Sequence, residues 1–337
     1  VIMKNASIGA FDSGLGGLTV VSQIHNYLPN ESIVYFGDTG RVPYGIRSNE
    51  TIIRYAKQDI NFLKSNNVKL IVAACGTVSS VASSAADGLD VPYVEVVTPA
   101  SKMAAECTKN GKIGVIGTAA TIASNSYKNK ILGINDVFTV YQYACPLFVP
   151  LVEEGFKKHQ VTDEIIDYYL ASLKQSDIDA LILGCTHYPL LRSKIKEYVG
   201  EKITLVNPAY ETAMDLKRIL QEMDMENPDI EGDHGSYSFY VSDAADKFKN
   251  FFGSLLKTGG RNDPFAKGFD GSAACYLARL VTAHAVTNDE EHSFAAPEPD
   301  GTKAILVDLA AHTDVAFSAK IHKISFPTQK APKVFNE

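Results

Sequence analysis

The chain has 337 residues, of which 45% are hydrophobic and 21% are charged, and it carries a net charge of −7. This is enough for a core shared by two domains, or by two lobes with an appendage. The absence of a lysine–arginine block argues against nucleic acid as a partner. No apolar stretch approaches the roughly 20 residues that cross a bilayer, so we expect no membrane association.

The five cysteines form no C-x-x-C pair, and the first residues include no secretory apolar region. An odd number of widely spaced cysteines argues against a disulfide framework and for a reducing compartment. We therefore expect a cytoplasmic protein.

Short apolar runs alternate with longer amphipathic stretches along most of the chain. We predict strands at 7–11, 32–37, 69–74, 93–97, 112–116, 138–142, 180–184, 204–207 and 238–242. We predict helices at 49–65, 162–173, 189–198 and 209–222. Alternation of strands and helices is typical of a parallel, doubly wound α/β sheet.

The chain changes character after about residue 260. This stretch predicts a helix at 272–286 and strands at 303–309 and 321–326, separated by a proline-rich turn. It fits neither lobe, so we treat it as a C-terminal extension of unknown role.

The same order of features occurs twice. A strand beginning near Ile8 leads to an apolar run that ends at Cys75, and a strand beginning near Ile113 leads to one that ends at Cys185. The two pairs are separated by similar lengths of chain. The repeat predicts two similar α/β lobes that face each other across a cleft.

Both cysteines therefore follow predicted parallel strands, where ligands bind in open α/β sheets. A helix that starts beside Cys75 or Cys185 would lower the pKa of its thiol through the helix dipole. Two acid–base groups on opposite sides of one carbon suit proton removal with inversion. One thiolate removes an α-proton and the other thiol delivers a proton to the opposite face, without a cofactor.

Two further segments could bind a substrate. The segment from Asp12 to Thr19 resembles a phosphate-binding loop, but it lacks the P-loop lysine, and Asp12 could accept from a substrate ammonium group. The turn cluster that contains Tyr44 could hold a carboxylate through that side chain and nearby backbone amides. A plain tight turn is the alternative interpretation of the first segment, and the Tyr44 cluster is a weak signal by itself.

His187 lies two residues after Cys185 and could tune that thiol, hold a carboxylate or bind a metal. A zinc site of Cys75, Cys185 and His187 matches no standard ligand spacing, so we predict no metal. Glu153 and Glu154 could form a solvated helix start, or one of them could polarise His187.

Taken together, these segments resemble the glutamate racemases of the cofactor-independent amino-acid racemase superfamily, over about residues 7–256. The segments that carry the resemblance are 8–19, 35–45, 74–77, 114–118, 144–155 and 183–191.

The resemblance implies two α/β lobes with the active site in the cleft between them. One lobe would comprise residues 1–98 and 208–260, the other 99–207, with an extension at 261–337. It implies Cys75 and Cys185 as the two bases, with Glu154 assisting His187. The substrate would be surrounded by Asp12, Ser13, Tyr44, Gly45, Gly76, Thr77, Thr186 and His187.

The implied reaction interconverts L- and D-glutamate, and the D-isomer enters bacterial peptidoglycan. No cofactor is expected, the partner is a small amino acid, and a homodimer is compatible with this picture.

One residue departs from the family pattern. The family usually has asparagine directly after the first cysteine, where this chain has Gly76. The asparagine side chain contacts the substrate in that family, so its loss makes the preference for glutamate less secure than racemisation itself. The alternatives are a related racemase acting on aspartate, a hydantoin or another acid with an activated α-hydrogen, and a two-lobed ligand- or metal-binding protein without catalysis.

Overall fold

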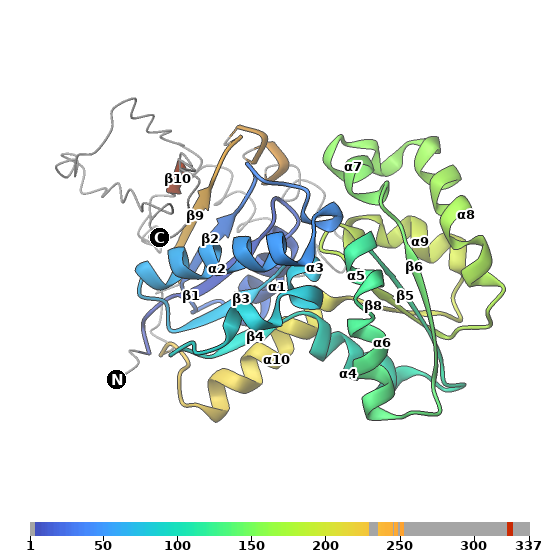
Figure 1. Ribbon diagram of the computed structural model, residues 1–337, viewed down its shortest axis with the longest axis horizontal. Helices are drawn as coiled ribbons and strands as arrows, with labels where there is room; N and C mark the ends of the chain where they lie inside the picture. Colours follow the sequence, from blue (N-terminus) through green and yellow to red (C-terminus); the bar gives the residue numbers. More distant parts are fainter. Residues whose placement is uncertain (1–3, 229–234, 245, 249, 253–321, 326–337) are drawn as a thin grey trace, which may run out of the picture.

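The computed structural model describes residues 4–228, 235–244, 246–248, 250–252 and 322–325. The strands in this part of the chain form two sheets, one in each half of the molecule (Figure 1). The strands are β1 (Ile8–Asp12), β2 (Ile33–Gly37), β3 (Leu70–Ala73), β4 (Tyr93–Glu95), β5 (Lys112–Gly117), β6 (Thr139–Ala144), β7 (Ala180–Leu183), β8 (Thr204–Val206), β9 (Tyr237–Val241) and β10 (His322–Ser325).

The two sheets share one strand order. The first sheet runs β10-β9-β2-β1-β3-β4 and the second runs β6-β5-β7-β8. In both, the lobe's first strand lies between its second and third strands, and the fourth lies beside the third. All pairs are parallel except β9 with β10. The predicted two-lobed α/β fold is therefore confirmed, with β10 as an antiparallel edge strand from the extension.

The central strands are buried along their whole length. Every residue of β1, β2, β3 and β7 is buried, because helices cover both faces of a doubly wound sheet. This explains why continuous apolar runs, rather than alternating patterns, reveal these strands in the sequence.

Ten α-helices connect and cover the strands between β1 and β9. They are α1 (Leu18–Tyr27), α2 (Asn49–Ser65), α3 (Gly76–Val81), α4 (Val97–Cys107), α5 (Ala119–Ala123), α6 (Ser126–Ile134), α7 (Phe148–Glu153), α8 (Gln160–Lys174), α9 (Arg192–Val199) and α10 (Pro208–Glu222). Four 3₁₀ helices, η1 (Tyr44–Ile46), η2 (Ser83–Ala86), η3 (Phe156–Lys158) and η4 (Tyr188–Leu191), complete them. None of these helices combines the length and the hydropathy needed to span a membrane.

The chain crosses between the two sheets near α4 and near α10. Helix α10 begins at Pro208, with the Asn207 side chain accepting a hydrogen bond from the Ala209 amide at 3.2 Å. It packs against both α1 and α4. One apolar cluster includes Ile8 of the first lobe and Leu183 of the second, so the lobes share part of their core.

The predicted lobe boundaries at residues 98 and 208 stay a prediction; the first falls inside α4 and the second at the start of α10. The predicted strand at 321–326 is β10. The predicted helix at 272–286 and strand at 303–309 lie outside the described residues.

Candidate active site

The two thiols occupy equivalent places in the two lobes. Cys75 follows β3 and is the residue directly before α3, while Cys185 follows β7 and leads into η4. Both are buried. A Cβ atom placed on Gly76 would lie 2.6 Å from the Gly184 carbonyl oxygen and 3.6 Å from the Cys185 Cα. The two cysteine-bearing loops therefore meet directly where the lobes join.

The Cys75 thiol is surrounded by groups of the first lobe. It donates to the Ser13 hydroxyl at 3.6 Å. One carboxylate oxygen of buried Asp12 accepts from the Gly14 amide at 2.9 Å, while Asp12 Oδ1 makes no hydrogen bond with any described residue. Burial raises the pKa of Asp12, although nearby His187 counteracts this effect. The free oxygen makes Asp12 a fitting acceptor for an ammonium group.

Burial, with a further contribution from the Asp12 charge, raises the pKa of the Cys75 thiol to about 12. The expectation that the helix start lowers this pKa is therefore wrong. Helix α3 has only six residues, and the cost of desolvating a thiolate outweighs its dipole.

The Cys185 thiol lies beside an imidazole. His187 Nδ1 is 3.9 Å from Cys185 Sγ, and His187 Nε2 is 3.1 Å from Glu153 Oε1. Burial alone would lower the pKa of His187, but its hydrogen bonds to Cys185 and Glu153 raise it to about 10. Burial alone would raise the pKa of Glu153, yet His187 and Lys247 lower it to about 2. At neutral pH this arrangement favours an imidazolium beside Cys185.

The partner of His187 is Glu153, which corrects the expected role of Glu154. Glu153 is the last residue of α7 and its side chain is only 12% exposed. Glu154 is 63% exposed and contacts Lys247 at 3.4 Å. Successive residues of a helix point about 100° apart, so only one of the two can face the imidazole.

Hydroxyl groups also connect the lobes. Thr77 Oγ1 in α3 lies 3.0 Å from Thr118 Oγ1, just before α5 of the second lobe. Thr19 in α1 donates to the Thr186 carbonyl at 3.0 Å. The sequence analysis did not single out Thr118 or Thr19 as site residues, because their partners lie across the lobe boundary.

Two glycines permit the close approach of the lobes. A Cβ atom at Gly16 would lie 2.2 Å from Thr186 Oγ1 and 2.5 Å from His187 Nδ1, and one at Gly45 would lie 2.8 Å from the Thr118 Cβ. The glycine-rich segment after β1 therefore fits closely against the Cys185 loop.

The Tyr44 side chain supports the loop that carries it. Its hydroxyl donates to Asp38 and, at 3.1 Å, to Asp59, and Arg41 binds the same two carboxylates at 2.5 and 2.9 Å. Burial and the Asp38 charge raise the pKa of Asp59, against the effect of Arg41. This use of the hydroxyl leaves the backbone of Tyr44 and Gly45 as the groups available to a carboxylate.

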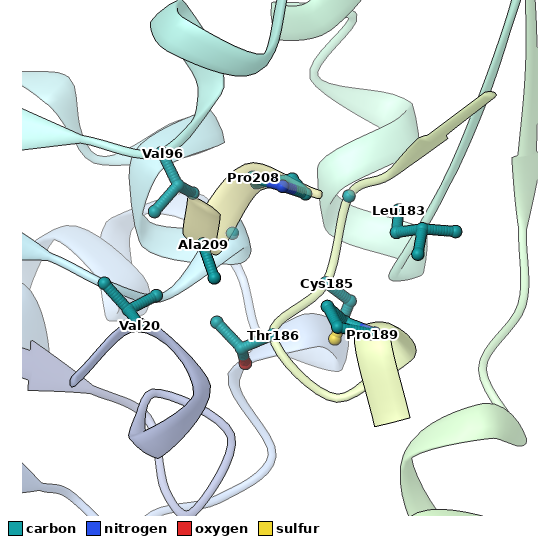
Figure 2. A pocket seen from close by; sticks show the side chains of 10 residues that line it. Val20, Val96, Leu183, Cys185, Thr186, Pro189, Pro208 and Ala209 are labelled. Atoms are coloured by element: carbon teal, nitrogen blue, oxygen red, sulfur yellow. The ribbon is translucent and has the colours of Figure 1, made fainter. Parts of the chain in front are cut away.

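An apolar hollow lies behind the Cys185 loop (Figure 2). Val20, Val96, Pro208 and Ala209 line one side of it, and Leu183, Cys185, Thr186 and Pro189 line the other. Residues from both lobes line this hollow, so Cys185 lies where the two lobes pack against each other.

The structure thus gathers Asp12, Ser13, Cys75, Gly76 and Thr77 from the first lobe against Cys185, Thr186 and His187 from the second. Within the described residues, no group of three or more His, Cys, Asp or Glu side chains is placed to hold a metal ion. The fold and these contacts define a two-lobed α/β protein with a buried thiol from each lobe at the lobe junction.

Comparison with known proteins identifies the family. A model of the Asp/Glu/hydantoin racemase family matches residues 16–215. The chain is 45% identical over 238 residues to a glutamate racemase of Geobacter metallireducens. This alignment covers 70% of this chain and 87% of the relative. The chain is likewise 45% identical to a glutamate racemase of Thermoanaerobacter pseudethanolicus, covering 73% and 91%.

Solved structures agree. A glutamate racemase isoform from Bacillus anthracis aligns with a TM-score of 0.72 at 38% identity, covering 75% of this chain and 95% of that one. A glutamate racemase from Francisella tularensis, solved in complex with D-glutamate, aligns with a TM-score of 0.71 at 36% identity, covering 76% and 95%. The chain belongs to the Asp/Glu/hydantoin racemase family, and the relatives compared above are glutamate racemases.

Proposed function

We propose that this chain is a cofactor-independent glutamate racemase that uses Cys75 and Cys185 as its two acid–base groups. The observation that carries the proposal is the meeting of the two cysteine loops, one from each lobe, at Gly76 and Gly184. A substrate held between them would present opposite faces of its α-carbon to different thiols. The D-glutamate seen in the related Francisella tularensis structure supports glutamate as the substrate.

The chemistry is a proton relay through one carbon. The thiolate on one lobe takes the α-proton, and its sulfur gains that hydrogen as the C–H electron pair stays on the α-carbon. The thiol of the opposite lobe then gives its proton to the other face and becomes a thiolate. Each turnover therefore exchanges the protonation states of Cys75 and Cys185 and leaves the enzyme ready for the reverse reaction.

The neighbouring groups would support the carbanionic transition state. Asp12 Oδ1 is buried and available to the substrate ammonium group. The hydroxyls of Thr77 and Thr186, with backbone amides nearby, would carry the charge that develops on the α-carboxylate. His187 would give a proton to Cys185 or take one from it as the direction of the reaction changes.

The proposed product has a physiological use. D-Glutamate supplied by this reaction would enter peptidoglycan and so serve cell-wall synthesis. A cytoplasmic location fits, because Cys75 and Cys185 are free thiols and must stay reduced to transfer protons.

A circular-dichroism assay on purified protein tests the proposal. We expect L- and D-glutamate to be racemised without added pyridoxal phosphate. Cys75→Ser and Cys185→Ser should each lower the rate by about 10³-fold, because each removes one proton-transfer group. Cys107→Ser, at the end of α4, is the matched control and should leave the rate unchanged.

Survival of activity within about tenfold in either active-site variant would overturn the two-thiol scheme. Faster turnover of aspartate than of glutamate in the same assay would instead assign the chain to another substrate of its family.

A further inference from the structure

Lys247 connects the first lobe to the His187 side of the site. It lies in the short helical segment that follows β9, beside α7 in Figure 1. Its Nζ is 3.0 Å from Glu153 Oε2 and 3.4 Å from Glu154 Oε1, at the end of α7 in the second lobe. The other oxygen of Glu153 binds His187. Lys247 and His187 therefore hold the two ends of one carboxylate.

The backbone around Lys247 is anchored in the first lobe. The adjacent Phe248 ring is buried and packs against Tyr35 and Phe239, with ring centres 6.1 and 5.8 Å apart. The Phe251 ring lies 6.2 Å from the His187 ring. Lys247 is thus fixed to one lobe while its partner Glu153 is fixed to the other, and separation of the lobes would break their contact.

Resting on the function proposed above, we propose that Lys247 is a positioning residue for catalysis. From the first lobe it binds Glu153, holds that carboxylate against His187 and so favours the imidazolium beside Cys185. Lys247 touches none of the reacting atoms itself.

The charges around His187 give the direction of this effect. Cys185 on its own loop, Glu153 from α7 and Asp12 from β1 all favour the imidazolium. Within the described residues, Lys247 and His187 are the two cationic groups that contact Glu153, and both lower the pKa of that glutamate. Removing the lysine charge leaves the negative charge of Glu153 less compensated, which stabilises the protonated form of His187. Loss of the imidazolium proton of His187 should then require a higher pH.

The effect should be modest, because the Lys247 side chain is 47% exposed and water screens its charge. We expect Lys247→Met in the full chain to move the alkaline limb of the pH profile of kcat/KM, where His187 loses its proton, upward by about half a pH unit. Lys247→Arg keeps the charge and should restore the wild-type profile. Glu154→Gln, which removes only the longer contact, is the matched control and should also retain that profile.

An unchanged profile in Lys247→Met would overturn the proposal, as would an equal shift in Lys247→Arg, which would indicate packing alone. A shift in Glu154→Gln as large as that in Lys247→Met would reassign the effect to Glu154 and also overturn it. The variants are compared with a wild-type protein that has first been shown to racemise glutamate. A wild-type protein that fails to racemise glutamate would count against the proposed function and not against the role of Lys247.

Discussion

The two cysteines occupy equivalent positions in two lobes of the same strand order, yet their neighbours carry opposite charge. Cys75 lies beside Ser13 and the carboxylate of Asp12. Cys185 lies beside His187, whose pKa is raised by its hydrogen bonds to Cys185 and Glu153. The fold therefore repeats the position of the thiol but not its chemistry.

This asymmetry is compatible with a reaction whose substrate and product are mirror images. L- and D-glutamate have the same free energy in water, so kcat/KM must be equal in the two directions for the wild type and for every variant. The residues that supply the proton on each face need not match. With a pKa of about 12, Cys75 rests as a thiol and can act first as a proton donor.

Among the residues that distinguish the Cys75 side of the site from the Cys185 side, Asp12 should have the largest effect on kcat/KM. Asp12→Asn removes the charge expected to hold the substrate ammonium and should lower kcat/KM by about 100-fold, or about 3 kcal/mol. The same change removes the charge that raises the pKa of Cys75, so alkylation of Cys75 by iodoacetamide should become faster at a given pH. Peptide mass spectrometry measures that rate. An unchanged alkylation rate would show that Asp12 does not act on the thiol.

The contact between the two loops can be tested at Gly76. A Cβ atom there meets the Gly184 carbonyl oxygen at 2.6 Å, so both Gly76→Ala and Gly76→Asn should force the lobes apart. We expect each to lower kcat/KM for glutamate by about tenfold, since small displacements of reacting groups are costly. Higher activity in Gly76→Asn than in the wild type would show that the asparagine contact of the family outweighs this steric effect.

The smallest effect should be on stability, and only the His187 side should show it. The pKa of His187 is raised to about 10 in the folded protein, against about 6.5 for an unperturbed histidine. Its contribution to stability is therefore fully present below about pH 6.5 and is lost as the pH rises through about 10. The melting temperature of the wild type should exceed that of His187→Asn most below about pH 6.5. This difference should shrink by a few degrees as the pH rises to about 10. A constant difference in melting temperature across this range would contradict the raised pKa.

Much of the fold could be predicted because its central strands are continuous apolar runs. The predicted strand at 112–116 is β5 (Lys112–Gly117), and the one at 204–207 is β8 (Thr204–Val206). The short helices α5 and α7 were not predicted. Five or six residues are too few to show a helical period, and their positions depend on tertiary contacts.

Residues with local signals could be found in the same way, whereas contacts between the lobes could not. Cys75 and Cys185 each follow a strand and Asp12 ends one, and that placement can be read from the sequence. The choice between Glu153 and Glu154 depends on the orientation of α7, and Lys247 depends on how the lobes meet. The pKa of Cys75 depends on its burial, which outweighs the local helix dipole.

The fate of the α-proton in D₂O tests the central claim most directly. Starting from either protonated enantiomer, the product should carry deuterium from the first turnovers, while recovered substrate stays protonated early in the reaction. Each thiol would then be serving one face of the α-carbon. Deuterium that enters recovered substrate as fast as it enters product, measured by mass spectrometry after chiral separation, would show a single group serving both faces and would contradict the account.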